Sequence, residues 1–316
     1  MLLGIDIGGS KIAYALGDRS GRILARRRRP TEPSGDPALD LDRMAADAQA
    51  LLAEEGEGAL EGVGVSVPGP LDARLGQVIR PPNLPNWDAV PVAALLEERL
   101  GSPVALENDA NAAALAEYRF GAGRGCQDLV YLTLSTGVGG GIILGGQLHR
   151  GKIGSAGELG HIPLEWPGEP CACGLSGCLE AYTGGAALAR RLREHAPDSS
   201  ACLALAGDRE ALSAEHLVEA ARSGDAWAGE EMNRFNDYVA QAVVSLAFAL
   251  APERVVLGTI AVAAGESLCF EPVRARVAER LWPHQAPYLE ILPAALGEDL
   301  PYQAALCVAL QAGQTG

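Results

Sequence analysis

Short apolar runs alternate with helical patterns over the first 120 residues of the chain. Apolar runs of strand length are followed by stretches in which apolar residues recur every three or four positions. We predict strands at residues 2–7, 12–16, 23–28, 62–67 and 104–107, and helices at residues 41–55, 91–100 and 110–120. This alternation predicts an α/β fold in which helices cover a sheet.

A similar order of elements begins again near residue 128. We predict a strand at 128–135, a glycine-rich turn, a second strand at 141–144, helices at 186–195, 216–223 and 226–250, strands at 254–257 and 289–292, and a helix at 302–311. The succession of strand, glycine turn and strand therefore occurs twice, at residues 2–16 and 128–144. Two lobes of related build would explain this. We place the small lobe at residues 1–118 plus 300–316 and the large lobe at residues 119–299.

Composition narrows the range of functions. The chain has 316 residues, 48% of them hydrophobic, with 25 basic and 40 acidic residues and a net charge of -15. We expect neither nucleic acid nor a membrane as a partner, because this charge repels phosphate backbones and anionic lipids. The most apolar helix, at residues 239–252, is shorter than the ~20 residues of a membrane span. The start of the chain lacks the features of a secretory signal, so we expect a cytoplasmic location.

The first glycine turn follows a strand and carries groups that suit a phosphate. Its residues are Asp6, Gly8, Gly9, Ser10 and Lys11. The glycines let backbone N–H groups approach phosphate oxygens, the hydroxyl can donate a hydrogen bond, and the lysine offsets negative charge. The aspartate can hold Mg²⁺ through water. The alternative is a plain hairpin turn.

The second glycine turn combines the hydroxyl of Thr136 with Gly137 and Gly139. Neither turn is a P-loop or a dinucleotide fingerprint, because both lead into strands and not into helices. As a pair they predict a clamp that holds a triphosphate from two sides.

A further carboxylate stands where a strand gives way to a helix. Asp109 follows Asn108 there, and strand ends of open α/β sheets are where ligands bind. Phosphoryl transfer from ATP to a sugar needs a carboxylate that accepts the proton of the attacking hydroxyl. Asp109 is our candidate for this general base, and Asn108 can fix a neighbouring hydroxyl. The alternative is that Asp109 merely caps its helix.

The most specific pattern is a set of one histidine and three cysteines, His161, Cys171, Cys173 and Cys178. A Cys₃His set suits a structural Zn²⁺ with all four positions filled, which disfavours a catalytic metal. The chain has seven cysteines, an odd number that argues against a disulfide framework. The alternative is a set of buried free thiols.

Two glutamates flank this set within residues 158–180. Glu158 lies three residues before the histidine, and Glu180 lies two residues after the last cysteine. A metal that fixes the set also fixes both carboxylates, which can accept hydrogen bonds from vicinal sugar hydroxyls. His161 can offer its second ring N–H to the same sugar. The alternative is that both glutamates are simply exposed.

These motifs together resemble the ROK family of repressors, open reading frames and sugar kinases, over nearly the whole chain and in the family's order. The resemblance implies an actin-like, ribonuclease H-like fold of two lobes, with ATP, Mg²⁺ and a hexose in the central cleft, and a homodimer. It also implies Asp109 as catalytic base and Zn²⁺ at the Cys₃His set. It assigns sugar contacts to Gly69, Asn83, Asn108, Asp109, Glu158, His161 and Glu180.

The resemblance favours glucose as the hexose. Residues 82–87, Pro-Asn-Leu-Pro-Asn-Trp, are similar to the Asn-Leu-Pro-Gly-Trp loop of the family's glucokinases, with Asn86 in place of glycine. Asn and Gly both tolerate left-handed turns. An N-acetylglucosamine or N-acetylmannosamine kinase is an alternative that shares the zinc cluster. A sugar-sensing regulator is a non-enzymatic alternative, but the residues before the first glycine turn leave no space for a helix-turn-helix.

One turn departs from the family's pattern. Near the expected adenosine, Gly258 is followed by Thr259 and Ile260, where the family usually has three glycines. β-Branched residues resist positive φ and place side chains where the turn should be open. Weaker ATP binding, or another phosphoryl donor, is the hypothesis that follows.

Overall fold

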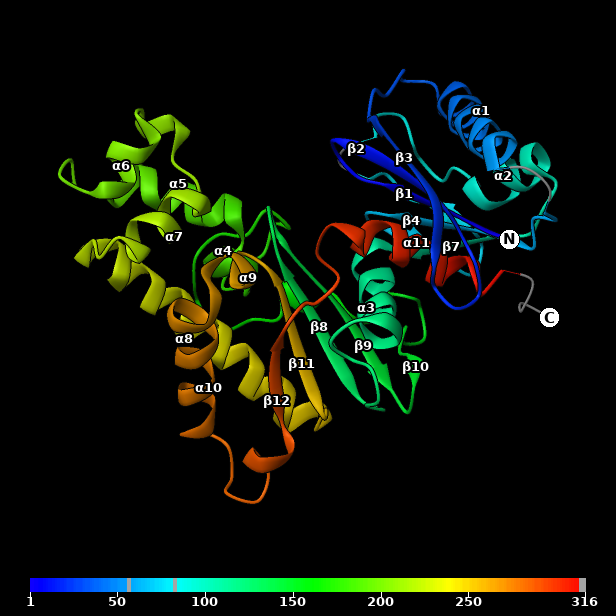
Figure 1. Cartoon of the computed structure of the whole chain (residues 1–316). Coiled ribbons are helices and arrows are strands. Elements are labelled where there is room, and N and C mark those ends of the chain that lie inside the picture. Colours follow the sequence, from blue (N-terminus) through cyan, green and yellow to red (C-terminus); the bar gives the residue numbers. More distant parts are fainter. Residues whose placement is uncertain (56–57, 82–83, 313–316) are drawn as a thin grey trace. The chain divides into compact units, whose positions relative to one another are not determined.

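The computed structural model describes residues 1–55, 58–81 and 84–312, which form two compact units (Figure 1). Unit 1 comprises Met1–Gly121, Arg150–Ala156 and Leu296–Gly316, and unit 2 comprises Ala122–His149 and Gly157–Ala295. Each unit contains one five-stranded sheet.

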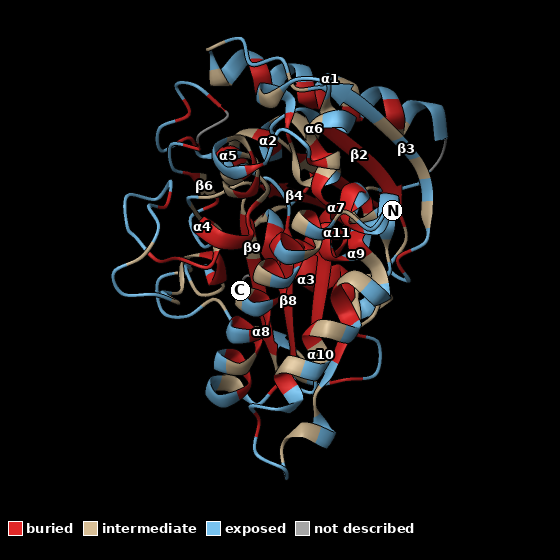
Figure 2. Ribbon diagram, turned by 90° about the vertical axis from the view of Figure 1, so that its left-hand side faces the viewer, coloured by how far each residue is buried: buried red, intermediate tan, exposed pale blue. Residues whose placement is uncertain are grey.

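The sheet of unit 1 has the strand order β3-β2-β1-β4-β7. The strands are β1 (Leu2–Ile7), β2 (Lys11–Gly17), β3 (Ile23–Pro30), β4 (Gly62–Val67) and β7 (Val104–Asn108). Strands β1, β2 and β3 pair antiparallel, whereas β1, β4 and β7 pair parallel. Strand β2 is mainly buried and the edge strand β3 largely exposed (Figure 2). The arginines of β3 therefore lie at a sheet edge, where charge discourages pairing with another chain.

Both faces of this sheet are covered by helices. Helices α1 (Pro37–Glu55) and α2 (Val92–Leu100) share one apolar core with the sheet, and α11 (Leu300–Ala309) contributes to another. Helix α3 (Asp109–Phe120) follows β7 directly, and a short hairpin joins β5 (Leu71–Asp72) to β6 (Gln77–Val78). A Cβ atom on Gly64 would lie 2.1 Å from the backbone nitrogen of Ala309. Glycine at this position lets α11 approach the sheet closely.

The sheet of unit 2 has the order β10-β9-β8-β11-β12. Its strands are β8 (Leu129–Leu134), β9 (Val138–Leu144), β10 (Gln147–Leu148), β11 (Arg254–Thr259) and β12 (Glu290–Pro293). Strands β8, β9 and β10 pair antiparallel, and β8, β11 and β12 pair parallel. The succession of strand directions is the same as in unit 1, as the repeated strand, turn and strand pattern predicts.

Helices of unit 2 pack on this sheet around a large apolar core. They are α4 (Glu180–Thr183), α5 (Gly185–His195), α6 (Ala201–Ala206), α7 (Ala214–Arg222), α8 (Ala226–Leu250), α9 (Ile260–Gly265) and α10 (Glu271–Ala278). Over the described residues, none of the helices combines the length and the apolarity that a membrane crossing requires.

Most of the predicted elements are observed, and the structure differs from the prediction in the following places. Strand β9 begins at Val138, not at residue 141, so Gly139 and Gly140 pair with β8 and the turn is shorter than predicted. Helices α4, α6, α9 and α10 and the short strands β5, β6 and β10 were not predicted, and α1 begins at Pro37, four residues earlier than expected. Helix α3 begins at Asp109, one residue earlier than expected.

Candidate active site

The predicted site residues fall into two groups, one in each unit. In unit 1, the first glycine turn connects β1 to β2, and the backbone N–H of Gly8 donates to the carbonyl of Lys11 at 2.9 Å. Thr31 donates its hydroxyl to the carbonyl of Gly8 at 2.7 Å and its N–H to the carbonyl of Ser10 at 3.0 Å. Gly9, Ser10 and Lys11 are exposed. The turn is thus anchored from one side and accessible from the other.

Asp6 lies on β1 just before this turn. Its carboxylate accepts a hydrogen bond of 2.7 Å from the hydroxyl of Ser66 on the neighbouring strand β4. Burial raises the pKa of Asp6 to about 7, the Ser66 hydrogen bond opposes that rise, and the negative charge of Asp109 adds to it. A cation beside Asp6 would favour its charged form. This electrostatic environment fits the predicted hold on Mg²⁺.

Asp109 is the first residue of α3, and it is not the helix cap. The cap is Asn108, whose side-chain oxygen accepts from the N–H groups of Ala110 at 2.9 Å and Asn111 at 3.1 Å. The alternative that Asp109 merely caps its helix is therefore wrong. A backbone hydrogen bond of 2.8 Å from Ala110 steadies the Asp109 carboxylate, which remains exposed. An exposed, oriented carboxylate meets the first requirement for a general base.

A buried carboxylate that the sequence did not single out fixes this strand end. Glu107 is 2% exposed and accepts from the N–H of Asn108 at 3.0 Å and from the amide of Asn111 at 3.0 Å. Arg150 donates to its other oxygen at 2.7 Å. Buried carboxylates require such partners. This pair could not be predicted from local sequence patterns, because 43 residues separate the two charges.

The loop that resembles the glucokinase loop is anchored in unit 1. Asn86 takes a φ of 65°, in the left-handed region that its replacement of glycine requires, and its amide donates to the carbonyl of Gly35 at 2.8 Å. Trp87 is buried and its ring N–H lies 3.3 Å from the carboxylate of Asp40. The predicted sugar ligand Asn83 lies outside the described residues. Gly69 lies just after β4, a strand of the sheet that also contains Asp6 on β1 and Asn108 on β7.

The second glycine turn, in unit 2, lies between β8 and β9. The N–H groups of Gly185 and Ala186, at the start of α5, donate to the carbonyls of Ser135 at 2.6 Å and Thr136 at 2.9 Å. A Cβ atom on Gly137 would lie 2.4 Å from a carboxylate oxygen of Glu180. That same oxygen accepts from the N–H of Val138 at 2.9 Å. A side chain at position 137 would therefore displace the carboxylate of Glu180, which stabilises the turn through Val138.

The four predicted zinc ligands come together in unit 2. The ligand atoms of His161, Cys171, Cys173 and Cys178 all lie within 4.8 Å of one another. Nδ1 of His161 lies 3.7 Å from Sγ of Cys171, and Sγ of Cys173 lies 3.8 Å from Sγ of Cys178. Bonds of about 2.0 to 2.3 Å to a tetrahedral zinc place ligand atoms about 3.3 to 3.8 Å apart. The residues thus fit a tetrahedral Zn²⁺.

Three of the residues predicted to contact sugar, Glu158, His161 and Glu180, belong to this part of unit 2. Glu180 begins α4, and its second carboxylate oxygen lies 3.5 Å from Sγ of Cys171. Glu158 is exposed and His161 partly exposed. Between them, a Cβ atom on Gly160 would lie 2.1 Å from the carbonyl oxygen of Val138, so this segment packs directly on β9. Glu180 therefore connects the metal cluster to the second glycine turn.

The turn after β11 corrects the expectation for Thr259 and Ile260. Thr259 adopts a φ of 56°, although its β-branched side chain was expected to resist a positive value. Ile260 is only 9% exposed, so its side chain does not fill the open side of the turn. Gly258 remains glycine where a Cβ atom would lie 2.9 Å from the hydroxyl oxygen of Tyr131. The turn keeps a glycine-like backbone without the second and third glycines.

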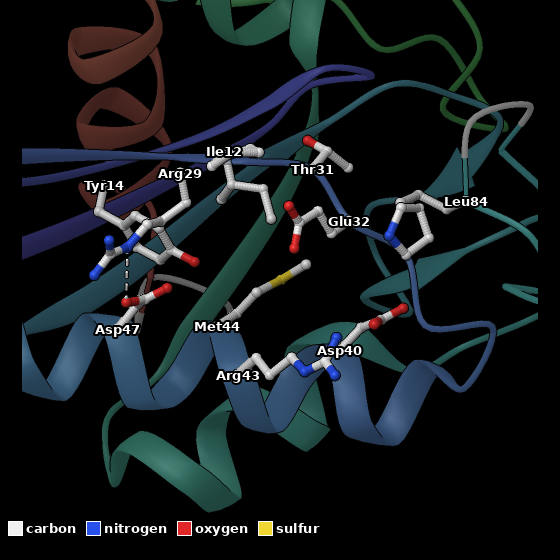
Figure 3. A pocket seen from close by; sticks show the side chains of 12 residues that line it. Ile12, Tyr14, Arg29, Thr31, Glu32, Asp40, Arg43, Met44, Asp47 and Leu84 are labelled. Carbon is white, nitrogen blue, oxygen red and sulfur yellow. Dashed lines mark hydrogen bonds and ion pairs between the residues drawn. The ribbon is translucent and has the colours of Figure 1, made fainter.

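Unit 1 also contains a hollow of about 380 Å³ between α1 and the ends of β2 and β3 (Figure 3). Its lining includes Tyr14, Arg29, Glu32 and Arg43, and Arg29 pairs with Asp47 at 3.2 Å. No predicted site residue lines this hollow. We assign it no part in the reaction.

Comparisons with known proteins agree with the predicted fold and family. A glucokinase of Thermotoga maritima is 40% identical over 300 residues, which cover 94% of this chain and 93% of that protein. The crystal structure of a ROK hexokinase from Thermus thermophilus, 37% identical, matches with a TM-score of 0.83 over 98% of this chain and 97% of that one. A ROK family glucokinase from Streptomyces griseus, solved with glucose and AMPPNP, is 35% identical and matches with a TM-score of 0.80 over 99% of both chains.

The likeness to these structures confirms the predicted actin-like, ribonuclease H-like α/β fold. The sequence profile of the family described as "ROK family" matches residues 2–312 of this chain. Because that match and the relatives span almost the whole chain, the protein belongs to the ROK family, as its motifs predicted.

Proposed function

We propose that this protein is an ATP-dependent hexokinase that converts glucose to glucose 6-phosphate. The observation that carries the proposal is the placement of Asp109, an exposed carboxylate at the carboxyl end of β7 whose capping role is taken by Asn108. The 40% identity to a glucokinase over nearly the whole chain supports the same reaction.

In the proposed reaction, the sugar hydroxyl attacks the terminal phosphorus of ATP. A new bond forms between the sugar oxygen and phosphorus, the bond from phosphorus to the bridging oxygen of ADP breaks, and Asp109 takes the hydroxyl proton. Ser10, Lys11 and the backbone N–H groups of the first turn stabilise charge on the transferring group. Mg²⁺ would neutralise phosphate charge, and Asp6 is the residue placed to hold it through water.

We propose that Glu158, His161 and Glu180 of unit 2 bind the sugar hydroxyls, together with Gly69, Asn83 and Asn108 of unit 1. The nucleotide binds to Thr136, Gly137 and Gly139, and to Gly258. His161, Cys171, Cys173 and Cys178 hold a structural Zn²⁺, and the metal's contribution is to fix the positions of the surrounding side chains.

A substrate panel tests the proposed reaction. ADP release is measured with Mg²⁺, ATP and, in turn, glucose, mannose, fructose, N-acetylglucosamine and N-acetylmannosamine, and then with other nucleotides or polyphosphate as donor. We expect the largest kcat/KM with glucose and ATP, with a KM for ATP in the micromolar-to-millimolar range. Preference for an N-acetylated sugar would select the alternative kinase. Absence of sugar-dependent ADP release would favour a sugar-sensing regulator.

The homodimer and the cytoplasmic location stay predictions. Sedimentation of the purified protein, with and without glucose, tests the first.

A further inference from the structure

The backbone of Thr259 is unusual for any residue other than glycine. Its φ is 56° and its ψ is -105°. Non-glycine residues with positive φ normally have ψ of roughly 30 to 60°, and the values at Thr259 resemble the first central position of a type II′ turn, where glycine predominates. A β-branched side chain makes the conformation still less favourable. Residues held in this way cluster at binding and active sites.

The side chain of Thr259 forms a pair with a second threonine. Its hydroxyl oxygen lies 2.9 Å from the hydroxyl oxygen of Thr133 on β8. One hydroxyl of such a pair donates to the other, so the second hydroxyl keeps its hydrogen for a further partner. Thr259 is exposed and Thr133 is partly exposed. The pair therefore offers a neutral hydrogen-bond donor at the surface of unit 2.

This donor lies beside the second glycine turn. Strands β8 and β11 are parallel neighbours, and Thr259 is the register partner of Leu134, immediately before the turn at Ser135–Gly137. Ligands of open α/β sheets bind at the carboxyl ends of such strands. The hydroxyl pair and the proposed nucleotide-binding turn thus share one edge of one sheet.

We infer that Thr259 helps to bind ATP. Its hydroxyl, supported by Thr133, donates a hydrogen bond to an oxygen of the phosphate chain of the nucleotide. The inference rests on the proposed function and names a contact within it. The opposite expectation is that Thr259 obstructs the nucleotide, in which case its removal would tighten binding.

Three substitutions at one position separate these expectations. Thr259→Val keeps the branched shape and removes the hydroxyl, Thr259→Ser keeps the hydroxyl, and Thr259→Gly removes both hydroxyl and strain. Ser245→Ala is a matched control, because it removes a hydroxyl on α8 that donates to the carbonyl of Gln241 in the same helix. Calorimetric titration with AMPPNP and Mg²⁺, without sugar, measures the Kd for each variant, and adenosine provides a ligand without phosphates.

We expect Thr259→Val to raise the Kd for AMPPNP about fivefold to tenfold, the loss of one hydrogen bond. Thr259→Ser should stay within about twofold of the parent, and adenosine should bind all variants alike. The same Thr259→Val change should raise the KM for ATP and leave kcat and the KM for glucose nearly unchanged.

An unchanged Kd in Thr259→Val would overturn the inference, as would tighter binding in Thr259→Gly. An equal loss with adenosine and AMPPNP would also overturn it, because the contact would then be to the nucleoside. A parent protein that binds AMPPNP and phosphorylates no sugar would refute the proposed function, and the result for Thr259 would stand separately.

Discussion

The two sheets have the same succession of strand directions, but their carboxyl edges carry different chemistry. In unit 1 the edge and its turn hold charged groups, Asp6, Lys11 and Asp109. In unit 2 the corresponding edge holds the neutral hydroxyls of Thr136 and of the Thr133–Thr259 pair. The carboxylate of Glu180 beside them is bound to the backbone N–H of Val138. Two sheets of the same topology thus carry different functional groups at their carboxyl edges.

The difference indicates that the two edges have different functions in the proposed reaction. Burial, with a smaller contribution from the negative charge of Asp109, raises the pKa of Asp6, and a carboxylate in this environment can take up a proton or hold a cation. Neutral hydroxyls and backbone N–H groups can bind phosphate oxygens without a change of charge. Changes to charge in unit 1 should therefore alter turnover, and changes to hydroxyls in unit 2 should alter nucleotide affinity.

The largest effect should follow from Asp109→Asn. Because the amide cannot accept the hydroxyl proton, kcat should fall by about 10²- to 10⁴-fold while the Kd for glucose changes by less than about tenfold. Single-turnover kinetics and glucose titration measure the two quantities. Near-normal turnover would show that Asp109 is not the general base, and would contradict the proposal that charged groups of unit 1 determine turnover.

Removal of the metal should have the next largest effect. Cys178→Ala, or chelation, should release the segment around Glu158 and Glu180 and weaken glucose binding about 100-fold or more. Metal content is measured by elemental analysis and glucose affinity by calorimetry. Because Cys126 is buried in unit 2 outside the cluster, Cys126→Ala serves as a control that should retain the metal. Unaltered affinity in the metal-free protein would count against this account.

Asp6→Asn should separate activity from stability. Folding raises the pKa of Asp6 from 3.8 to about 7, so the folded protein binds this proton more tightly than the unfolded chain. The ionised side chain has no cost below about pH 4, opposes folding increasingly up to about pH 7, and has its full cost above that. The variant, without Mg²⁺, should therefore melt several degrees higher than the parent at pH 8, a difference that vanishes near pH 4. Its turnover should nevertheless fall.

Melting curves across this pH range measure the first effect, and assays with varied Mg²⁺ measure the second. A stability difference that does not depend on pH would show that Asp6 is not the group that titrates.

The smallest effect expected is that of Thr136→Val on the hydroxyl side. Loss of one hydroxyl should raise the KM for ATP about fivefold to tenfold, with kcat changed by less than about threefold. Initial rates with varied ATP at saturating glucose measure both constants. A fall in kcat with an unchanged KM for ATP would contradict the proposal that the hydroxyls of unit 2 determine nucleotide affinity and not turnover.

Much of the fold was predictable because its cause is local. Apolar periodicity located the strands of both sheets except the short β10, and the spacing of Cys171, Cys173 and Cys178 located the metal cluster, since ligands close in sequence need little long-range information. The family and the fold class are confirmed. The roles of the individual site residues stay predictions.

What the sequence did not disclose depends on contacts between distant segments. The buried pair of Glu107 and Arg150 joins residues 43 positions apart. The pairing of Thr133 with Thr259 depends on the parallel register of β8 and β11. Likewise, local preference predicted that Thr259 would avoid positive φ, whereas the surrounding turn enforces it. At such positions, contacts between distant segments determine the side-chain pairing and the backbone conformation.

The central proposal is that one hexose is bound by Asp109 together with Glu158 and His161. A crystal structure with glucose and AMPPNP tests it most directly. The account predicts a single glucose whose 6-hydroxyl lies within hydrogen-bond distance of Asp109 and whose other hydroxyls reach Glu158 and His161. A glucose bound to residues of one unit alone, or beyond reach of Asp109, would contradict it.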